Sequence, residues 1–521
     1  MPAIDLRLGI DVGGTNTDAV VMDRHDQLLA KAKVPGTPDV TGGIDAAIAA
    51  VLQAPGVEAQ RITHVMLGTT HATNAILERR QLGRVAVVRI GSPATHAVRP
   101  LFGWPEDLRQ VVSVGETIVG GGIEFDGRDI APFDAPALAR FLGEVGSKAD
   151  AVAITSVFSP VSARHELEAE EVVRRELGPI QISLSHLVGS FGLLERENAT
   201  VLNAALVGVA RAVTGAVRTS LRSRGLDPVT FFAQNDGTLM ALDYAVQYPV
   251  LTIGSGPANS IRGAGFLTGS KDAVVLDVGG TSSDVGVLVG GFPRQSSQGV
   301  EVGGVRTNFR MPDLVTLAIG GGTVVNQRGD YVGLGPESVG YRIQQEALAF
   351  GGSTATLTDA AVTAGRVHLG THPIPSSFRP LAGQALALSD QRLGDAIDRV
   401  KTSRADCLLI AVGGGSVLLP ESLPGVSEIH RPEHFDVANA IGATIAKVSG
   451  QVDRIAQIGP GGREEALSKA SEEAREQAIL AGADPGKVEV VEIEEIPMAY
   501  MTNPSLRVRI KAVGDLGTSG T

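Results

Sequence analysis

The segment D-V-G-G-T-N-T-D at residues 11–18 recurs as D-V-G-G-T-S-S-D at residues 277–284. Six of the eight positions are identical, and the second copy begins 266 residues after the first. Each copy follows an apolar run, residues 6–12 and 271–278, and precedes another, which is the pattern of a β-hairpin closed by a tight glycine turn. The repetition predicts two domains that carry the same hairpin and are related by a pseudo-twofold axis.

The residue types in this repeated segment suit the binding of a triphosphate. A strand that ends in aspartate brings a carboxylate to the edge of a sheet, where it can hold Mg²⁺ through water or orient an attacking group. Two glycines let backbone N–H groups approach phosphate oxygens, and the threonine hydroxyl adds a donor. Two such hairpins that face each other would grip a triphosphate from both sides.

We therefore expect ATP and Mg²⁺ as cofactors. Asp11 and Asp277 are the candidate catalytic carboxylates, and with Asp284 they are the candidate metal ligands. The candidate phosphate-binding residues are Gly13, Gly14, Thr15, Asn16, Gly279, Gly280, Thr281 and Ser282. The alternative is a plain turn between two strands, and the second copy with the same flanks argues against it. Neither the G-x-x-x-x-G-K-[ST] phosphate loop nor a dinucleotide-binding G-x-G-x-x-G explains the repeat.

A third glycine turn follows another apolar strand about 130 residues after the second hairpin. Residues 408–412 are apolar and lead into Gly413, Gly414, Gly415 and Ser416. We assign these four residues as a candidate adenosine-binding turn, in which the glycines make room for base and ribose. The signal is weak alone, because triple glycines also occur from Gly120 and from Gly320.

The rest of the chain alternates between strand-like and helical segments, which predicts a mostly parallel, covered sheet in each domain. The expected fold is α/β, with two related actin-like (ribonuclease H-like) ATPase domains flanking a cleft and a small C-terminal α/β appendage. The expected domains are residues 1–190, 191–450 and 451–521. Helices predicted at 193–224 and 435–448 carry small residues (203–205 and 438–443), which suit a close crossing at a hinge between domains.

Composition limits the classes of partner. The formal charge of −12, with no dense run of lysine or arginine, argues against nucleic acid. The single cysteine, Cys407, excludes a disulfide framework and a cysteine-rich metal site within one chain. The N-terminal segment does not fit a signal peptide, and no apolar run reaches the ~18 residues of a membrane-spanning helix. We therefore expect a cytoplasmic protein without a membrane partner.

Several further segments resemble the hydantoinase/oxoprolinase family of actin-like ATPases. L-G-T-T-H-A-T-N-A-I-L-E-R-R (67–80) is similar to the family's H-G-T-T-x-A-T-N-A-x-L-E-R, and A-Q-N-D-G-T-L-M (233–240) is similar to its Q-S-N-G-G-x-M stretch. Further matches are T-I-G-S-G-P-A (252–258), Asp313 with I-G-G-G-T (319–323), and Glu195 with N-A-T-V-L-N-A (198–204). The resemblance spans about residues 6–370. Within these segments the candidate substrate contacts are Thr70, His71, Asn74, Asn235 and Asp313.

The resemblance implies an ATP-dependent hydrolase of cyclic amides such as hydantoins or 5-oxoproline. Phosphorylation of the amide oxygen would turn a poor electrophile into a reactive one. It also implies a second enzyme subunit and an oligomeric assembly. Some relatives carboxylate ketones, so an ATPase subunit of a ketone carboxylase is an alternative. An activator of another protein and a small-molecule kinase are further alternatives, although the cluster-carrying activators of this fold need paired cysteines.

Overall fold

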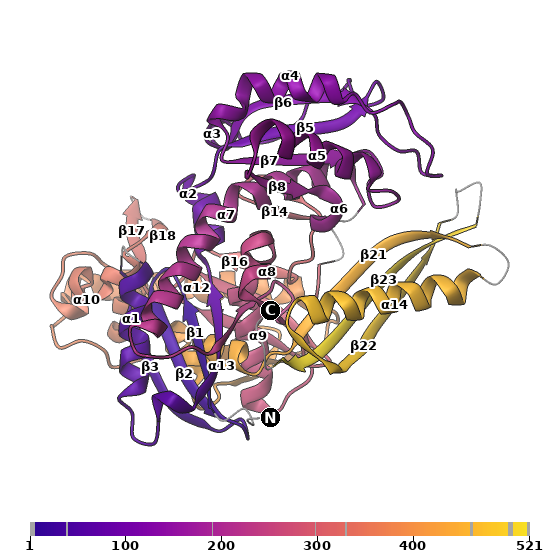
Figure 1. Cartoon of the computed structure of the whole chain (residues 1–521). Helices are drawn as coiled ribbons and strands as arrows, with labels where there is room; N and C mark the ends of the chain where they lie inside the picture. The colour runs from indigo at the N-terminus through magenta and orange to yellow at the C-terminus, as the bar shows by residue number, and fades with distance from the viewer. Residues whose placement is uncertain are drawn as a thin grey trace.

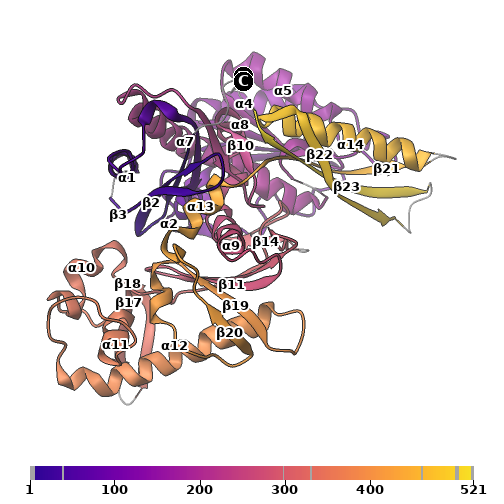
Figure 2. The same cartoon turned by 90° about the horizontal axis from the view of Figure 1, so that it is seen from below.

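Two sheets with the same strand order form the centre of the molecule, one in each lobe (Figure 1, Figure 2). The computed structural model describes residues 6–37, 40–189, 191–296, 299–328, 331–458, 462–498 and 504–517. In the first lobe the order β3-β2-β1-β4-β9 is formed by β1 (Leu6–Val12), β2 (Asn16–Asp23), β3 (Leu28–Pro35), β4 (Ile62–Thr69) and β9 (Val229–Ala233). In the second lobe the order β16-β12-β11-β19-β20 is formed by β11 (Ala273–Val278), β12 (Ser283–Val289), β16 (Leu314–Leu317), β19 (Cys407–Val412) and β20 (Val426–His430).

Both predicted hairpins are confirmed. β1 pairs antiparallel with β2 and parallel with β4, and β11 pairs in the same two ways with β12 and β19. The first aspartate of each repeat lies directly across from the last, Asp11 from Asp18 and Asp277 from Asp284. Every residue of β1 except Arg7 is buried, as expected for a strand covered on both faces. The duplicated segment therefore marks a duplicated fold.

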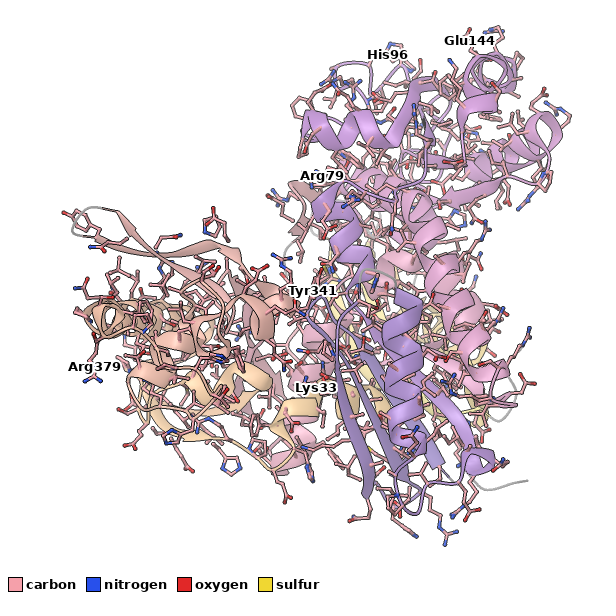
Figure 3. All side chains as sticks on the ribbon, turned by 90° about the vertical axis from the view of Figure 1, so that its left-hand side faces the viewer. Lys33, Arg79, His96, Glu144, Tyr341 and Arg379 are labelled. Carbon is pink, nitrogen blue, oxygen red and sulfur yellow. The ribbon has the colours of Figure 1, made fainter. Side chains whose placement is uncertain are left out.

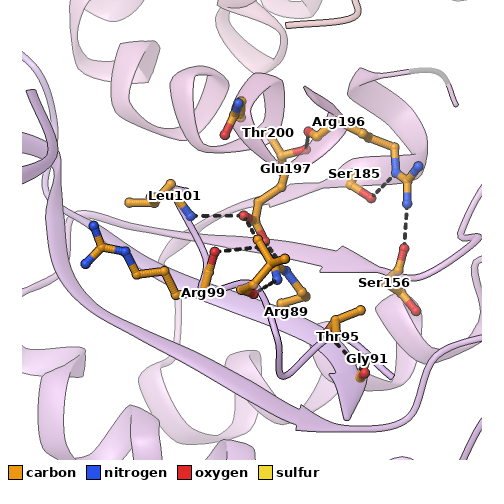
Figure 4. Close-up of polar contacts among 12 residues, drawn as sticks. Arg89, Gly91, Thr95, Arg99, Leu101, Ser156, Ser185, Arg196, Glu197 and Thr200 are labelled. Carbon is orange, nitrogen blue, oxygen red and sulfur yellow. Dashed lines mark hydrogen bonds and ion pairs between the residues drawn. The ribbon is translucent and has the colours of Figure 1, made fainter. Parts of the chain in front are cut away.

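A four-stranded parallel sheet is inserted between β4 and β9 and lies at the top of Figure 1. Its order β6-β5-β7-β8 is built from β5 (Val85–Ser92), β6 (Ser113–Gly120), β7 (Ala151–Ser156) and β8 (Gln181–Leu184). α7 (Leu193–Arg222) runs from this sheet down to the first lobe. Arg89 on β5 donates two hydrogen bonds to Glu197 on α7, both of 2.7 Å, in a fully buried ion pair (Figure 4). This pair fixes the inserted sheet on the helix, because breaking it would leave an unpaired buried charge.

The C-terminal strands extend the sheet of the first lobe. β21 (Val448–Gln457), β23 (Ser505–Leu516) and β22 (Ala483–Pro497) join it through β10 (Leu239–Ala241), giving nine strands, and α14 (Gly462–Leu480) covers the added part. We call β21, β22, β23 and α14 the arm; it projects to the right in Figure 1. The boundary expected at 190/191 lies between β4 and β9 of this sheet, and the one expected at 450/451 lies within β21, so each divides the strands of a single sheet. A β-strand pairs with whichever neighbour offers a free edge rather than with the nearest in sequence.

The two lobes meet at two crossing helices, α9 (Ser255–Thr268) and α13 (Ala438–Thr444). A Cβ on Gly263 would overlap the carbonyl of Ala438, and one on Gly442 would overlap the carbonyl of Asn259, so glycine is required at both positions. The expected crossing through residues 203–205 is wrong. These lie on α7, where the Asn203 amide donates to Ser183 Oγ and the Gln247 carbonyl, both at 3.0 Å. α13 is also shorter than predicted, because Val448 begins β21.

The remaining elements complete the layers. They are α1 (Val40–Leu52), α2 (His71–Glu78), α3 (Glu106–Val112), α4 (Ala135–Val145), α5 (Arg164–Leu177), α6 (Ser185–Val188), α8 (Leu242–Gln247), β13 (Phe292–Pro293), β14 (Val300–Val302), β15 (Val305–Thr307), β17 (Thr323–Arg328), β18 (Tyr331–Ser338), α10 (Ile343–Glu346), α11 (Leu357–Thr363) and α12 (Arg379–Val400).

Among the described helices, α7 alone is long and apolar enough to cross a membrane by length and composition. Its apolar window is 72% buried inside the protein, as in a core helix.

Candidate active site

The turns of the two hairpins have the same hydrogen bonding and face each other. Gly13 N donates to Asn16 O at 3.0 Å, and Gly279 N donates to Ser282 O at 2.9 Å. The hydroxyl oxygens of Thr15 and Thr281 lie 3.5 Å apart across the boundary between the lobes. A Cβ on Gly280 would lie 2.7 Å from the Thr15 methyl carbon, so the lobes touch at these turns. The sequence-predicted phosphate-binding residues of the two repeats are therefore brought together.

Asp11 is buried beneath the first turn. One of its carboxylate oxygens, Oδ2, accepts a hydrogen bond of 2.8 Å from Asn439 on α13. The other, Oδ1, is buried and has no hydrogen-bond partner among the described residues. Burial, reinforced by the charges of Asp18 and Asp277, raises the pKa of Asp11 to about 7.

Asp277 occupies the same place in the second lobe. Ser260 on α9 donates to its Oδ2 at 2.5 Å. Burial raises the pKa of Asp277, although the Ser260 hydrogen bond and the charge of Lys33 oppose this. Burial and the nearby Asp277 charge raise the pKa of Asp284 to about 6. The negative charge of Asp277 raises the pKa values of Asp11, Asp18 and Asp284, so the carboxylates of the two facing hairpins form one electrostatic centre.

The residues at this centre fit a divalent cation. Asp11 Oδ1 is buried without a described hydrogen-bond partner, which leaves it as a candidate ligand, and it packs against Gly68, where any Cβ would overlap it. Within the described ranges, no three His, Cys, Asp or Glu side chains form a metal site by themselves. Mg²⁺ needs no such cage, because it keeps several waters and shares phosphate oxygens with one or two carboxylates.

The third strand of each lobe contributes a different residue opposite the last aspartate. Lys33 on β3 lies across from Asp18 and forms an ion pair with it at 2.5 Å. Thr316 on β16 lies across from Asp284 and donates a hydrogen bond of 2.5 Å. Figure 3 places Lys33 in the region between the lobes. Burial raises the pKa values of Asp11, Asp18 and Asp277, and the Lys33 ammonium charge opposes this rise at all three, so it acts on both halves of the site.

The adenosine-turn residues lie directly behind the second hairpin, since β19 pairs in parallel with β11. A Cβ on Gly413 would overlap Asp277 Oδ1, and one on Gly415 would lie 2.7 Å from Val278 Cγ1. Gly414 has open space at its Cβ position, whereas the hydroxyl of Ser416 is buried without a described partner. Close packing therefore explains Gly413 and Gly415, and Gly414 is the residue that presents an open surface.

Two of the five candidate substrate contacts lie at the first hairpin. The Thr70 hydroxyl donates to Val12 O at 3.3 Å, and Asn74 Nδ2 lies 3.6 Å from the Cβ position of Gly14. His71 instead turns inward: its Nδ1 lies 2.9 Å from Thr69 Oγ1, and burial lowers its pKa.

The other two candidates lie away from the turns. The Asn235 side chain is buried and hydrogen-bonded at both ends, because its Nδ2 donates to Val250 O at 3.2 Å and its Oδ1 accepts from Gly254 N at 2.7 Å. Asp313 forms an ion pair with Arg294 at 2.8 Å. We therefore interpret Asn235 as a residue that holds the loop after β9.

Sequence reasoning missed several residues of the site. Lys33, Ser260 and Asn439 come from other elements, and no local motif signals them. Gly68 lies within the matched segment 67–80, and the glycines from Gly320 lie within the matched segment 319–323, but the sequence did not assign either to the site. In the structure Gly321 N donates to Gly279 O at 3.0 Å and Gly322 N donates to Gly280 O at 2.6 Å, so this loop braces the second hairpin.

A duplicated lobe with a glycine hairpin at each side of a shared boundary defines the actin-like ATPase class of fold. The family models for the "Hydantoinase/oxoprolinase N-terminal region" and for "Hydantoinase/oxoprolinase" match residues 7–177 and 196–376, together about two thirds of the chain. The chain belongs to the hydantoinase/oxoprolinase family.

Named relatives differ in the reaction that their names give. Caprolactamase subunit alpha of Pseudomonas jessenii is 28% identical over 79% of this chain and 60% of its own length. Acetophenone carboxylase gamma subunit of Aromatoleum aromaticum is 27% identical over 70% of this chain and 54% of its own length. The chain thus spans less than two thirds of the length of these relatives.

A solved structure extends the likeness in fold. The ATP-dependent caprolactamase from Pseudomonas jessenii superposes with a TM-score of 0.75 at 20% identity, covering 98% of this chain and 87% of that chain. The arm, which lies beyond the sequence resemblance, is therefore included in the common fold.

Proposed function

We propose that this chain binds Mg·ATP between the hairpins at 11–18 and 277–284 and transfers the γ-phosphoryl group to the carbonyl oxygen of a small cyclic amide. The observation that carries the proposal is the contact between two turns of the same geometry, with the Thr15 and Thr281 hydroxyls 3.5 Å apart beside a cluster of carboxylates. The similarity to caprolactamase subunit alpha supports a lactam as the substrate class.

Different residues of the chain would bind the phosphates, the metal ion and the adenosine. The glycine turns and the Thr15 and Thr281 hydroxyls would donate hydrogen bonds to phosphate oxygens, and the Lys33 ammonium group would offset the charge that develops during transfer. Asp11 and Asp277 would hold Mg²⁺, which when bound neutralises phosphate charge and orients the triphosphate. The base and ribose would lie over Gly414, the open position of the third turn.

The nucleotide requires a small opening of the lobes. A gap of 3.5 Å between the two hydroxyls leaves no room for a phosphate group between them. The crossing of α9 and α13 is the contact about which the lobes would separate and close again, and closure would exclude water from the transfer.

A second candidate function is activation of a ketone for carboxylation, favoured by the 27% identity to an acetophenone carboxylase subunit. Both reactions begin with a carbonyl oxygen that accepts a phosphoryl group. We propose that ring opening or carboxylation is completed with a second subunit, in a cytoplasmic hetero-oligomer, because both named relatives are subunits.

Isotope transfer tests the proposal. The full chain, with any protein that co-purifies, is given Mg·ATP and hydantoin, 5-oxoproline or caprolactam labelled with ¹⁸O at the carbonyl. We expect labelled inorganic phosphate, because the carbonyl oxygen leaves with the phosphoryl group. Phosphate release with no label transfer would overturn the proposal. Label-free release that needs both a ketone and bicarbonate would favour the second candidate.

A further inference from the structure

Two cavities meet beside the carboxyl end of β9, on the first lobe. One of about 350 Å³ is lined by the loop 234–236, by residues of β21 and β23 and by Arg310, and one of about 1240 Å³ lies between the inserted sheet, α8 and the arm. They share part of their walls: His186, Leu187, Tyr244, Gln451, Val452 and Asp453 line both. A volume of 350 Å³ suits a small organic ligand.

The smaller cavity opens at the same sheet edge as the first hairpin. β1, β4 and β9 are parallel neighbours, so their carboxyl ends lie side by side, with β9 two strand spacings, roughly 10 Å, from β1. The start of α9 links these ends, since Gly254 N donates to Asn235 Oδ1 at 2.7 Å and Ser255 Oγ donates to Thr69 O at 3.3 Å. Ligands of open α/β sheets bind outside the carboxyl ends of strands.

His186 on α6 is held at the junction of the cavities by a buried carboxylate. Glu166 on α5 is fully buried, and its Oε2 accepts from His186 Nδ1 at 2.6 Å and from His186 N at 3.0 Å. Its Oε1 accepts from Ser156 N at 2.8 Å and Ser185 Oγ at 2.5 Å. The Glu166 carboxylate must accept, so Nδ1 carries the proton and Nε2 is left as a base.

A second layer of contacts fixes this pair. Arg196 on α7 donates through Nε to Ser185 Oγ at 2.9 Å and through Nη2 to Ser156 O at 2.6 Å (Figure 4). The carboxylate, the serine and the arginine are all buried, whereas the His186 side chain retains 17% exposure on the cavity side. A histidine that is oriented by a buried carboxylate and lines a cavity has the arrangement of a general base.

We propose that the smaller cavity binds the carbonyl substrate and that His186 is the base that removes its proton. The inference rests on the proposed phosphorylation and specifies its proton transfer. As the carbonyl oxygen forms its bond to the γ-phosphorus, the bond from phosphorus to the ADP oxygen breaks. The amide N–H proton passes to His186 Nε2, and the C–N bond gains double-bond character. A ketone would lose an α-carbon proton to the same nitrogen.

Glu166 is a positioning residue in this step. It keeps the proton on Nδ1 and offsets the positive charge of the imidazolium that forms, without touching the substrate. The electron pair released by the N–H bond becomes the new C=N bond, so no oxidant or further co-reactant is needed.

Chemical rescue tests the base. We expect His186→Ala to lower lactam-stimulated phosphate release 10²- to 10⁴-fold with Mg·ATP affinity unchanged, and we expect added imidazole to restore it at least tenfold through the open cavity. Pyrazole has the same size but is a far weaker base, and it should not restore activity. Glu166→Gln should give a smaller loss that imidazole does not relieve. His96→Ala, at an exposed histidine on the inserted domain (Figure 3), is the matched control and should behave like the wild type.

Rescue by pyrazole as well as imidazole, or an active His186→Ala variant, would overturn the inference.

A binding experiment distinguishes failure of this inference from failure of the proposed function. Binding of 5-oxoproline, hydantoin and caprolactam to the full chain is measured by calorimetry. We expect Leu187→Trp, at the shared wall, to weaken binding of at least one probe tenfold, and Leu480→Trp, which faces only the larger cavity, to leave it unchanged. Probe binding without stimulated phosphate release would refute the phosphorylation but keep the cavity as the ligand site. No binding of any probe, or equal binding by both variants, would refute the cavity.

Discussion

The two hairpins have the same turn and the same strand register but different surroundings. In each, the first glycine donates to the carbonyl three residues later, and the first and last aspartates lie opposite each other. The first hairpin has Lys33 on its third strand and the unpartnered oxygen of Asp11, whereas the second has Thr316 in the equivalent register position and a serine bonded to Asp277.

This difference shows where a duplicated site can diverge. The turn itself is constrained by the phosphate that it would bind, so both copies keep it. The strands and helices that contact the turn are free to change, and they distribute the charge unequally. The first lobe supplies the lysine and the more deeply buried carboxylate, and the second lobe supplies the glycine brace and the adenosine turn.

The largest expected effect tests whether both aspartates are needed. We expect Asp11→Asn and Asp277→Asn each to lower ATP turnover at least 10³-fold, because each removes a carboxylate from the centre that would hold the metal. Phosphate release at saturating Mg·ATP measures this. If Asp11→Asn or Asp277→Asn keeps a tenth of the wild-type activity, the carboxylate of one hairpin is sufficient for ATP turnover.

The same two variants should differ in stability. In the nucleotide-free chain, Asp11→Asn should raise the free energy of unfolding by about 1–2 kcal/mol, because it removes a buried charge that lies beside other carboxylates and has one oxygen unpartnered. Asp277→Asn should raise it by a smaller amount, because the Ser260 hydrogen bond and the charge of Lys33 offset part of the cost of burying this carboxylate. Denaturant titration at pH 8 compares the two.

The next effect concerns the unequal third strands. We expect Lys33→Thr, which gives the first hairpin the residue type of the second, to lower turnover about 10²-fold, since it removes a cation that acts on three of the carboxylates. Thr316→Val should cost less than about threefold. Lys31→Thr, on the same strand but paired with Asp436, is the control and should be nearly silent. Equal losses for Lys33→Thr and Thr316→Val would contradict the division of charge.

Substitutions of the glycines that pack against the two turns should give a smaller difference, in Mg·ATP binding. A Cβ on Gly320 would lie 2.7 Å from the backbone of Gly280 and Thr281, while one on Gly36 would lie 3.0 Å from Thr15 O. Gly320→Ala should therefore displace the second turn and weaken Mg·ATP binding more than tenfold, and Gly36→Ala should weaken it about threefold. Calorimetric titration of both variants with Mg·ATP measures the two losses of affinity. A larger loss for Gly36→Ala than for Gly320→Ala would show that the first turn is the more tightly supported.

The hairpins and much of the site could be predicted because their signals are local. A strand, a glycine turn and a second strand are contiguous at 6–23 and again at 273–289, so period and turn chemistry identify them. Thr70 and Asn74, which were predicted as substrate contacts, follow the strand beside β1 and lie at the first turn, and their contact with substrate stays a prediction.

The rest depends on pairings between distant residues. Lys33 matters only because β3 pairs with β2 in one register, and Asn439 reaches Asp11 from 428 residues away. The arm joins the first sheet through a contact between Leu239 and Val448, which no local pattern encodes. Glu166 and His186 lie 20 residues apart on different helices, and only the packing of the inserted sheet joins them.

The smallest expected effect asks whether the two threonines act alike. Thr15→Val and Thr281→Val each remove one hydroxyl and keep the shape of the side chain, so each should weaken Mg·ATP binding about 5- to 10-fold, the net value of one ordinary hydrogen bond. If the hydroxyls bind separate phosphate oxygens after the lobes open, the double variant should show the product of the two losses, because independent contacts add in free energy. If they remain 3.5 Å apart and share one oxygen, the second substitution should cost much less than the first. A double-mutant cycle measured by calorimetry therefore reports whether the nucleotide separates the two turns.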